Sequence, residues 1–369
     1  MSRRRDEELF FLLLNWPPAP ASSIIRPIIR PFTASVEVTV MKKKFLALCT
    51  ALALALSLTG CGGETPSKTP EGESLKVAIV QQRAHPSLDE IRDAVEKELT
   101  DKAEELGLSL QVKNYNGNGD SNQLDQIGAQ IVSEKFDAVI PIASLAAQRM
   151  VNATEETDIP VIYAAVSDPE TTGITGMDRV TGTSDALNTE FMLDMMLAQN
   201  PEIRTVGLLY CPSEDSSTKP VQEAREYLKA KNIAVEERTG TDPTEIMSAA
   251  ASLAKQVDAV FTPTDNTVAS VELTIAETFI EAGVPHYAGA DSFVRNGAFA
   301  TCGVSYTELG IKTADMAIEY LTTGKLPGFH LMDGGIITVN TETAASLGAE
   351  YDMFRDMANE VREVVTTED

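Results

Sequence analysis

The chain is poor in the residues that build metal sites and disulfide frameworks. Its 369 residues include four cysteines, three histidines and one tryptophan. His85, His286 and His330 are far apart, and no Cys/His cluster has the spacing of metal ligands. The phosphate loop pattern GxxxxGK[ST] is absent as well. We therefore expect neither a metal ion nor a cofactor.

Positive charge is also scarce. The chain has 30 Lys and Arg against 55 Asp and Glu, a formal net charge of −25. Binding to nucleic acid depends on Lys and Arg that neutralise phosphates, so this balance excludes nucleic acid as a partner. The length of the chain exceeds one ordinary core and indicates two domains.

One apolar run stands out near the start of the chain. Residues 41–60 contain three lysines, an apolar stretch and small residues, the order of a secretory signal peptide. The apolar stretch, of about 14 residues, is too short to span a bilayer comfortably, which takes about 20. We predict that residues 1–40 are an extension upstream of the true start. The Gly-, Pro- and Ser-rich residues 61–74 should form a flexible tether.

The sequence LTGC, which ends at Cys61, resembles a bacterial lipobox. That resemblance implies that Cys61 becomes the lipid-modified first residue of an exported protein, anchored to the outer face of the cytoplasmic membrane. Cys49 would leave with the signal peptide, so Cys211 and Cys302 form the only possible disulfide. We predict instead that both are buried, unpaired small hydrophobic residues.

Short β-branched runs alternate with amphipathic stretches along the rest of the chain, a pattern typical of βαβ units and a parallel sheet with helices on both faces. The predicted strands are 75–80, 109–115, 136–142, 159–166, 204–210, 233–238, 257–263 and 284–290. The predicted helices are 87–106, 121–134, one from 145, 217–231, 243–255 and 267–282.

The two halves of this pattern also match each other in sequence. FDAVIPIASLAAQ at 136–148 aligns with VDAVFTPTDNTVA at 257–269, and IPVIYAAVSD at 159–168 aligns with VPHYAGADSF at 284–293. The repeat predicts an α/β protein made of two similar doubly wound lobes.

Small polar residues follow the strand ends in both halves. Open parallel sheets bind ligands outside the carboxyl ends of their strands, where the N-termini of helices offer free N–H groups. Any one of these residues could be a helix N-cap, but their paired recurrence favours a ligand cleft. The residues are Ser144, Ser167, Asp168, Asp265, Asn266, Thr267, Asp291 and Ser292.

Several longer stretches resemble a known family. VAIVQQRAHPSLDEIRDAV, AAVSDPE, VFTPTDNTVAS and VPHYAGADSFVRNGAFATCGVSYTELG are similar to the ABC-transporter substrate-binding lipoproteins of the tryptophan/tyrosine-binding type. The similarity runs from about residue 75 to 350. SDPETTGITG and CPSEDSS depart from the commoner family forms. The resemblance implies an aromatic amino acid or a related small molecule as cargo, without identifying it.

The resemblance also implies the type I periplasmic-binding-protein fold, in which two lobes joined by three crossovers close on a ligand. One lobe would comprise 75–182 plus 292–327 and the other 185–290 plus 335–369. Hinges would lie near 183, 291 and 330. The implied partners are ABC permease and ATPase subunits, with the membrane contacted only through the lipid anchor, and the protein is expected to be a monomer.

An amino-acid zwitterion needs an anion site and a cation site in one cleft. Ser144 and Thr267, at the starts of helices, are expected at the carboxylate of the ligand. Asp265 or Asp291 is expected at the ammonium, with Asp168 and Asp185 behind them. His85, Pro86, Tyr163 and Tyr306 are candidates for the apolar walls, although ordinary packing explains the tyrosines equally well and His85-Pro86 could be only a helix entry.

Two other classes of function fit parts of the pattern. The acidic residues could be an acid/base pair of an enzyme, but no histidine or cysteine nucleophile accompanies them, which disfavours catalysis. A receptor of the same fold for a nucleoside, sugar or signal molecule, feeding a membrane sensor, would have the same sequence features as a transport protein.

Overall fold

The computed structural model describes residues 74–358 and 360–367. The predicted extension at 1–40, the signal peptide at 41–60, Cys61 and nearly all of the tether at 61–74 lie outside the described residues. Within the described part of the chain, no helix combines the length and apolar character needed to cross a membrane.

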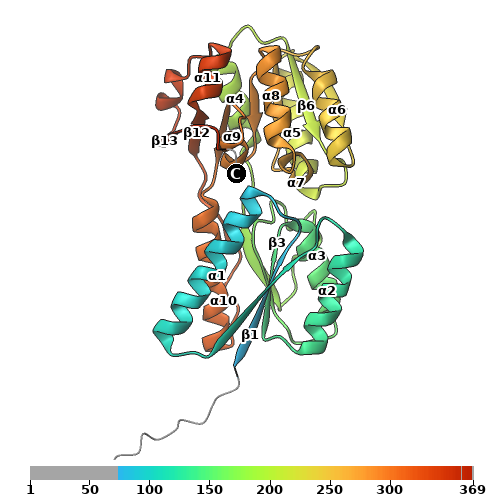
Figure 1. The fold of residues 1–369 in the computed structure, drawn as a ribbon, viewed down its shortest axis with the longest axis vertical. Helices are drawn as coiled ribbons and strands as arrows, with labels where there is room; N and C mark the ends of the chain where they lie inside the picture. Colours follow the sequence, from blue (N-terminus) through green and yellow to red (C-terminus); the bar gives the residue numbers. More distant parts are fainter. Residues whose placement is uncertain (1–73, 359, 368–369) are drawn as a thin grey trace, which may run out of the picture. The chain divides into compact units, whose positions relative to one another are not determined.

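The first lobe is built on a six-stranded sheet in the order β11-β5-β4-β3-β1-β2, in which every pair is parallel (Figure 1). Its strands are β1 (Leu75–Gln81), β2 (Leu110–Asn116), β3 (Ala138–Ile142), β4 (Val161–Tyr163), β5 (Val180–Ser184) and β11 (His330–Leu331). Its helices are α1 (Pro86–Leu106), α2 (Ser121–Glu134), α3 (Ser144–Ala153) and α10 (Tyr306–Thr323).

The second lobe is built on a seven-stranded sheet in the order β13-β12-β10-β9-β8-β6-β7, in which only the β10–β12 pair is antiparallel among the described strands. Its strands are β6 (Thr205–Tyr210), β7 (Ala234–Thr239), β8 (Ala259–Thr262), β9 (His286–Ala288), β10 (Ala300–Gly303), β12 (Ile336–Asn340) and β13 (Glu360–Val364). Its helices are α4 (Thr189–Gln199), α5 (Asp215–Ala230), α6 (Pro243–Leu253), α7 (Asn266–Ala269), α8 (Glu272–Ala282), α9 (Asp291–Arg295), α11 (Thr341–Leu347) and the 3₁₀ helix η1 (Asp352–Asp356).

The chain passes between the lobes three times, after β5, after β10 and after β11. The first and third crossings lie next to the predicted positions 183 and 330. The second crossing was predicted near 291, which is wrong, because β10 pairs with β9 and β12 of the second sheet. Residues 292–303 therefore belong to the second lobe, and the polar residues at 291 and 292 begin the short helix α9.

Helix α1 shows how the pattern of the sequence produces the fold. Pro86 occupies its first turn, where a missing N–H costs nothing, and Gly107 ends it in the left-handed conformation with φ 67°. Leu88, Ile91 and Val95 share one buried face, at the spacing of three and four residues that a helix requires. The predicted helix at 267–282 differs, because the chain breaks at Ser270 and Val271 into α7 and α8.

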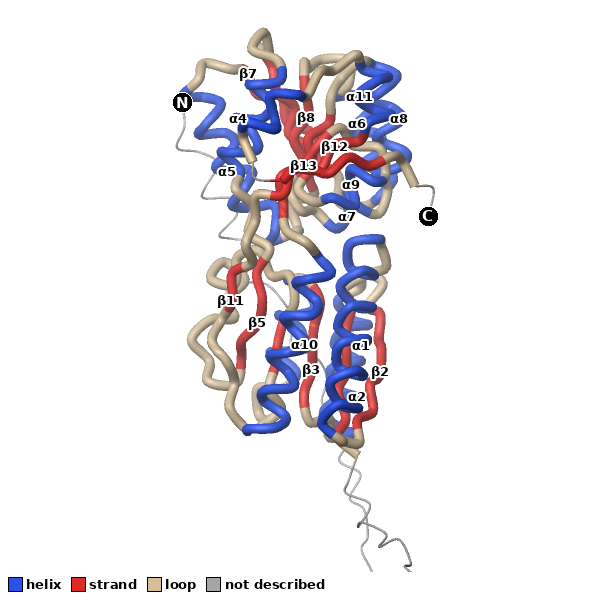
Figure 2. Tube along the Cα trace, turned by 90° about the vertical axis from the view of Figure 1, so that its left-hand side faces the viewer, coloured by secondary structure: helices blue, strands red, loops and turns tan. Residues whose placement is uncertain are grey.

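Helices α1 and α10 lie side by side against the first sheet (Figure 2). Gly310 of α10 allows their close approach, because a Cβ placed there would lie 2.7 Å from Cβ of Ala94 and 2.8 Å from the carbonyl oxygen of Ile91. Both described cysteines, Cys211 and Cys302, are free and buried, which confirms the prediction that they do not pair.

We predict that Gly310→Ala destabilises the protein by about 1–3 kcal/mol, because the added methyl group overpacks the contact between α1 and α10. This loss should occur even though alanine is favoured over glycine within a helix by about 1 kcal/mol. Chemical denaturation measures the difference. Asp315→Ala, at an exposed position of the same helix, is the control and should change stability by less than about 0.5 kcal/mol. A Gly310→Ala variant as stable as the parent would contradict the close-packing role.

Candidate functional site

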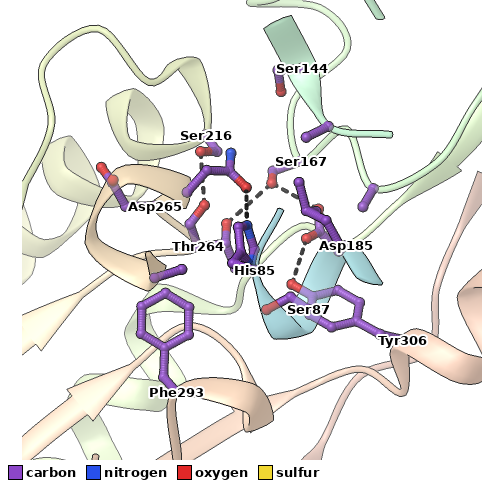
Figure 3. Close-up of a pocket in the computed structure, with 15 residues that line it drawn as sticks. His85, Ser87, Ser144, Ser167, Asp185, Ser216, Thr264, Asp265, Phe293 and Tyr306 are labelled. Carbon is purple, nitrogen blue, oxygen red and sulfur yellow. Dashed lines mark hydrogen bonds between the residues drawn. The ribbon is translucent and has the colours of Figure 1, made fainter. Parts of the chain in front are cut away.

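A cavity lies between the carboxyl ends of the two sheets (Figure 3). Its volume is about 20 Å³, roughly the space that one water molecule needs. The loops that follow β1, β3, β4, β5 and β8 reach it, as does Ser216 in the first turn of the helix after β6, as expected for open parallel sheets. Its lining includes seven residues predicted from the sequence: His85, Ser144, Ser167, Asp185, Asp265, Asn266 and Tyr306.

Asp185 lies in this cavity at the first crossing between the lobes, and its side chain is buried. Its carboxylate accepts hydrogen bonds from the hydroxyls of Ser167 at 2.8 Å and Tyr306 at 3.0 Å. Burial raises the pKa of Asp185, and the two hydroxyls oppose that rise. Among the described residues, no Lys, Arg or His forms an ion pair with it. Within the described part of the chain, Asp185 is therefore a buried acid without a cationic partner.

Asp265 reaches the same cavity but is already saturated by the protein. One carboxylate oxygen accepts from the backbone N–H groups of Thr267 and Val268, both at 3.0 Å, which caps α7. The other accepts from the Cys211 N–H and the Ser217 hydroxyl, both at 2.7 Å. Figure 3 shows this carboxylate turned away from the Asp185 side of the cavity. The prediction that Asp265 holds the ammonium is therefore not supported by the geometry, which gives it the role of a cap.

Two further acids predicted near the ligand do not line the cavity among the described residues. Asp291 forms an ion pair with Arg295 at 2.5 Å. Asp168 accepts from Thr171 N–H at 3.1 Å and its hydroxyl at 2.9 Å, in a turn that lines a separate hollow together with Lys219 of α5. Sequence position placed all these acids after strand ends, but only the tertiary structure shows which of them faces the cavity.

The remaining predicted residues, among those described, make contacts within the protein and do not line the cavity. Ser292 hydrogen-bonds to Ser87 across the lobes, and the Thr267 hydroxyl donates to Glu214 at 3.1 Å. Pro86 begins α1, and Tyr163 is buried in the strand β4, where it lines a separate hollow that Lys219 of α5 also lines. Among the described residues, Pro86 and Thr267 do not line the cavity and Tyr163 lines a separate hollow, so their contact with a ligand stays a prediction.

Sequence reasoning missed Glu214, which is buried between the lobes. Its carboxylate accepts from the Gln82 amide at 3.2 Å in the first lobe and from the Asn266 amide at 2.9 Å in the second. The only sequence signal was the unusual CPSEDSS stretch, which contains it. Glu214 and the adjacent loop supply donors and acceptors that connect the lobes.

Further contacts cross between the lobes around the cavity. The hydroxyls of Ser167 and Thr264 lie 3.3 Å apart, and Arg295 forms an ion pair with Glu90 at 2.7 Å. These contacts seal the cavity from several sides. The other pairs that cross are His85–Asn266, Ser87–Ser292 and Gln148–Asp215.

Two lining residues have strained backbones. Ala143, at the junction of β3 and α3, has φ 75°, and Ala165, after β4, has φ 53°. Residues other than glycine rarely adopt such values, which cost of the order of 1–3 kcal/mol and gather at functional sites. The strain lies at two adjacent strand ends that face the cavity.

The chain is similar to known proteins over most of its length. The family model "ABC transporter substrate binding protein" matches residues 76–353. The chain therefore belongs to this family, which is one of binding proteins and not an enzyme class. A curated relative, the tyrosine-binding protein of Clostridioides difficile, is 31% identical over 89% of this chain and 98% of its own length.

Two solved structures extend the comparison. A Streptococcus pneumoniae domain in complex with L-Trp is 28% identical, covers 78% of this substrate-binding protein and 99% of its own chain, and has a TM-score of 0.72. A ligand-free, open substrate-binding protein from Clostridium difficile is 29% identical, covers 79% and 100%, and has a TM-score of 0.60. These likenesses agree with the type I periplasmic-binding-protein fold expected from the sequence.

We predict that Asp185→Asn stabilises the ligand-free protein at neutral pH. Unfolded aspartate has a pKa near 3.9, and burial raises the folded value. Above about pH 4, the folded wild type must therefore ionise a group that resists ionisation, and its free energy of unfolding falls as the pH rises through that window. The advantage of the variant should be present at pH 7.5 and shrink toward pH 4, as measured by urea denaturation.

Asp168→Asn is the control of opposite sign. Partial burial raises the pKa of Asp168, but hydrogen bonds from Thr171 and Glu170 and the charge of Lys219 together outweigh it, and the net pKa is lowered. That variant should be the less stable one at pH 7.5, with the difference lost as the pH falls through the lowered pKa. If Asp185→Asn were destabilising at pH 7.5, the buried charge would have a partner that the structure does not show.

Proposed function

We propose that this protein is an exported lipoprotein that binds an aromatic amino acid between its lobes and delivers it to an ABC importer. Asp185 carries the proposal. A buried carboxylate with no protein cation is costly unless a charged partner joins it, and a ligand ammonium would supply that partner. The hydroxyls of Ser167 and Tyr306 would hold the carboxylate in place.

The carboxylate of the ligand requires N–H and O–H donors. Helix α3 begins at Ser144, whose side chain is buried and lines the cavity. The N-terminus of a helix favours anions because its first N–H groups have no partner within the helix. Leu145 N–H is already engaged by the Gln82 side chain at 3.1 Å, which leaves Ser144 as the residue that we assign to the ligand carboxylate.

The apolar part of the lining supports an aromatic side chain. Leu88, Ala269 and Phe293 line the cavity together with the ring of Tyr306. Such a surface with a few placed polar groups is the usual composition of a small-molecule site. The names of two relatives, a tyrosine-binding protein and a domain in complex with L-Trp, agree with this class of ligand.

Cys61 is the proposed point of attachment to the membrane. The lysines and apolar stretch at 41–60, followed by LTGC, support export and lipid modification. The polar residues 61–74 would then connect the lipid to the folded lobes, leaving them free to meet the permease and ATPase subunits of the transporter as a monomer.

We predict that L-tyrosine or L-tryptophan raises the unfolding temperature of the purified protein and that Asp185→Asn abolishes the shift. Loss of one member of a buried charge pair should cost about 3 kcal/mol of affinity, which is more than a hundredfold. A thermal-shift panel of amino acids, nucleosides and sugars identifies the ligand class, and calorimetry measures the affinity.

Asp291→Asn is the matched control, because Asp291 is paired with Arg295 and lies outside the cavity lining. The affinity of Asp291→Asn for L-tyrosine or L-tryptophan should stay within about threefold of that of the wild type. A shift produced only by ribose or a nucleoside would refute the amino-acid proposal. Equal affinity of Asp185→Asn and wild type would refute the role given to Asp185.

We also predict that ligand binding compacts the protein. A cavity of about 20 Å³ cannot admit an amino acid, so the lobes must part before the ligand enters. The higher TM-score with the L-Trp complex than with the open relative supports the view that the described arrangement is the closed one. X-ray scattering should show a smaller radius of gyration with L-tyrosine or L-tryptophan than without. An unchanged radius with a ligand shown to bind would contradict closure.

A further inference from the structure

His85 has an unexplained polar atom in the cavity. Its side chain is 6% exposed and lines the site. It stands at the N-cap position of α1 but makes no capping hydrogen bond. Its Nε2 lies 3.0 Å from Oδ1 of Asn266, whereas its Nδ1 is buried without a hydrogen-bond partner among the described residues. Buried polar atoms without partners are rare, and each one needs a reason.

The neighbours of His85 determine which nitrogen carries the proton. Oε2 of Glu214 accepts a hydrogen bond from the amide nitrogen of Asn266 at 2.9 Å. The Gln82 amide and the Thr267 hydroxyl also donate to the Glu214 carboxylate. Turning the Asn266 amide over would place its oxygen against that carboxylate. Asn266 therefore presents Oδ1 to His85, and His85 Nε2 must donate.

A neutral ring protonated on Nε2 has a bare lone pair on Nδ1. Burial lowers the pKa of His85 to about 4, and the charge of Arg83 adds to that effect, although the Asn266 hydrogen bond opposes it. The ring is thus neutral at pH 7. Its Nδ1 is an acceptor, so only a ligand group with a hydrogen to donate can satisfy it.

We propose that His85 is a specificity-determining residue that accepts, at Nδ1, a hydrogen bond from an N–H or O–H group of the bound ligand. This inference rests on the proposed function, because it assigns part of the same site. Glu214 and Asn266 act as positioning residues. They belong to the second lobe and His85 to the first, so the acceptor is correctly set only when the lobes are together.

Two parts of an aromatic amino acid could supply the hydrogen. One is the side chain, through a phenol hydroxyl or an indole N–H, and the other is the α-ammonium. A site that hydrogen-bonds a side-chain donor rejects analogues that lack it, because the buried acceptor is then left unpaired. Phenylalanine has the ammonium and no side-chain donor, so it separates the two sources.

Two variants of His85 isolate the acceptor. His85→Gln places an amide nitrogen near the position of Nε2, which keeps the donor to Asn266 and removes the Nδ1 acceptor. His85→Asn places an amide oxygen near the position of Nδ1, which keeps an acceptor and removes the contact with Asn266. Calorimetry of the purified wild type and both variants with tyrosine, tryptophan and phenylalanine gives the affinities.

A side-chain donor predicts that the wild type prefers tyrosine or tryptophan over phenylalanine by tenfold or more. His85→Gln should then lose that preference and His85→Asn keep most of it. An ammonium donor predicts that His85→Gln weakens all three amino acids by a similar factor of tenfold or more. Either result supports the role of His85 Nδ1 as a hydrogen-bond acceptor for the ligand. Affinities of His85→Gln within threefold of wild type for every ligand would overturn it.

Nitrogen-15 NMR of the histidine side chains, recorded with saturating L-tyrosine or L-tryptophan so that the lobes are together, tests the same inference by a second measurement. The His85 resonances, assigned by their loss in His85→Gln, should show a neutral ring protonated on Nε2 at pH 7 in the closed protein. Glu214→Gln should allow the Asn266 amide to turn and mix the two tautomers. A proton on Nδ1 in the wild type would overturn the inference. Failure of every aromatic amino acid to bind wild type would overturn the proposed function instead, whereas binding with a proton on Nδ1 would overturn only this inference.

Discussion

The requirement that buried polar groups find partners organises the space between the two lobes. A carboxylate out of water needs donors or a cation, and the three buried acids near the cavity meet this requirement in different ways. Asp265 has four protein donors, and Glu214 has amide and hydroxyl donors from both lobes. Asp185 has two hydroxyls and no protein cation among the described residues. This difference separates a helix cap, a link between the lobes and the acid that we propose as the partner of the ligand.

The same requirement couples ligand recognition to the positions of the lobes. Glu214 orients Asn266, and Asn266 orients the ring of His85. Nδ1 of that ring has no hydrogen-bond partner among the described residues and therefore needs a donor from the ligand. Each step is a hydrogen bond with one chemically possible direction. The bond between Asn266 and His85 joins the two lobes, so separation of the lobes would break it. In this proposal, selectivity for the ligand and closure of the lobes both depend on the Glu214–Asn266 and Asn266–His85 hydrogen bonds.

Two strained backbone positions and an ion pair between the lobes accompany these hydrogen bonds. Ala143 and Ala165 hold unusual backbone angles where β3 and β4 end, and both residues line the cavity. The Arg295–Glu90 ion pair joins the lobes farther out, where partial exposure to water makes it a weak and salt-sensitive contact. Such a rim contact can dissociate at little cost, as a binding protein that opens and closes requires.

The sequence alone was enough to predict two parallel-sheet lobes, the order of most strands and helices, unpaired Cys211 and Cys302, and polar residues at the carboxyl ends of the strands, where the cavity lies. Those features follow from local periodicity and from the repeat between the halves, both of which are written along the chain. The sequence did not predict that β10 belongs to the second sheet or that Glu214 lies between the lobes. It also did not predict that protein donors occupy both carboxylate oxygens of Asp265, or that Asp185 is buried without a cationic partner among the described residues. Each depends on which residues distant in sequence approach within hydrogen-bond distance, and only the packing of the two lobes decides that.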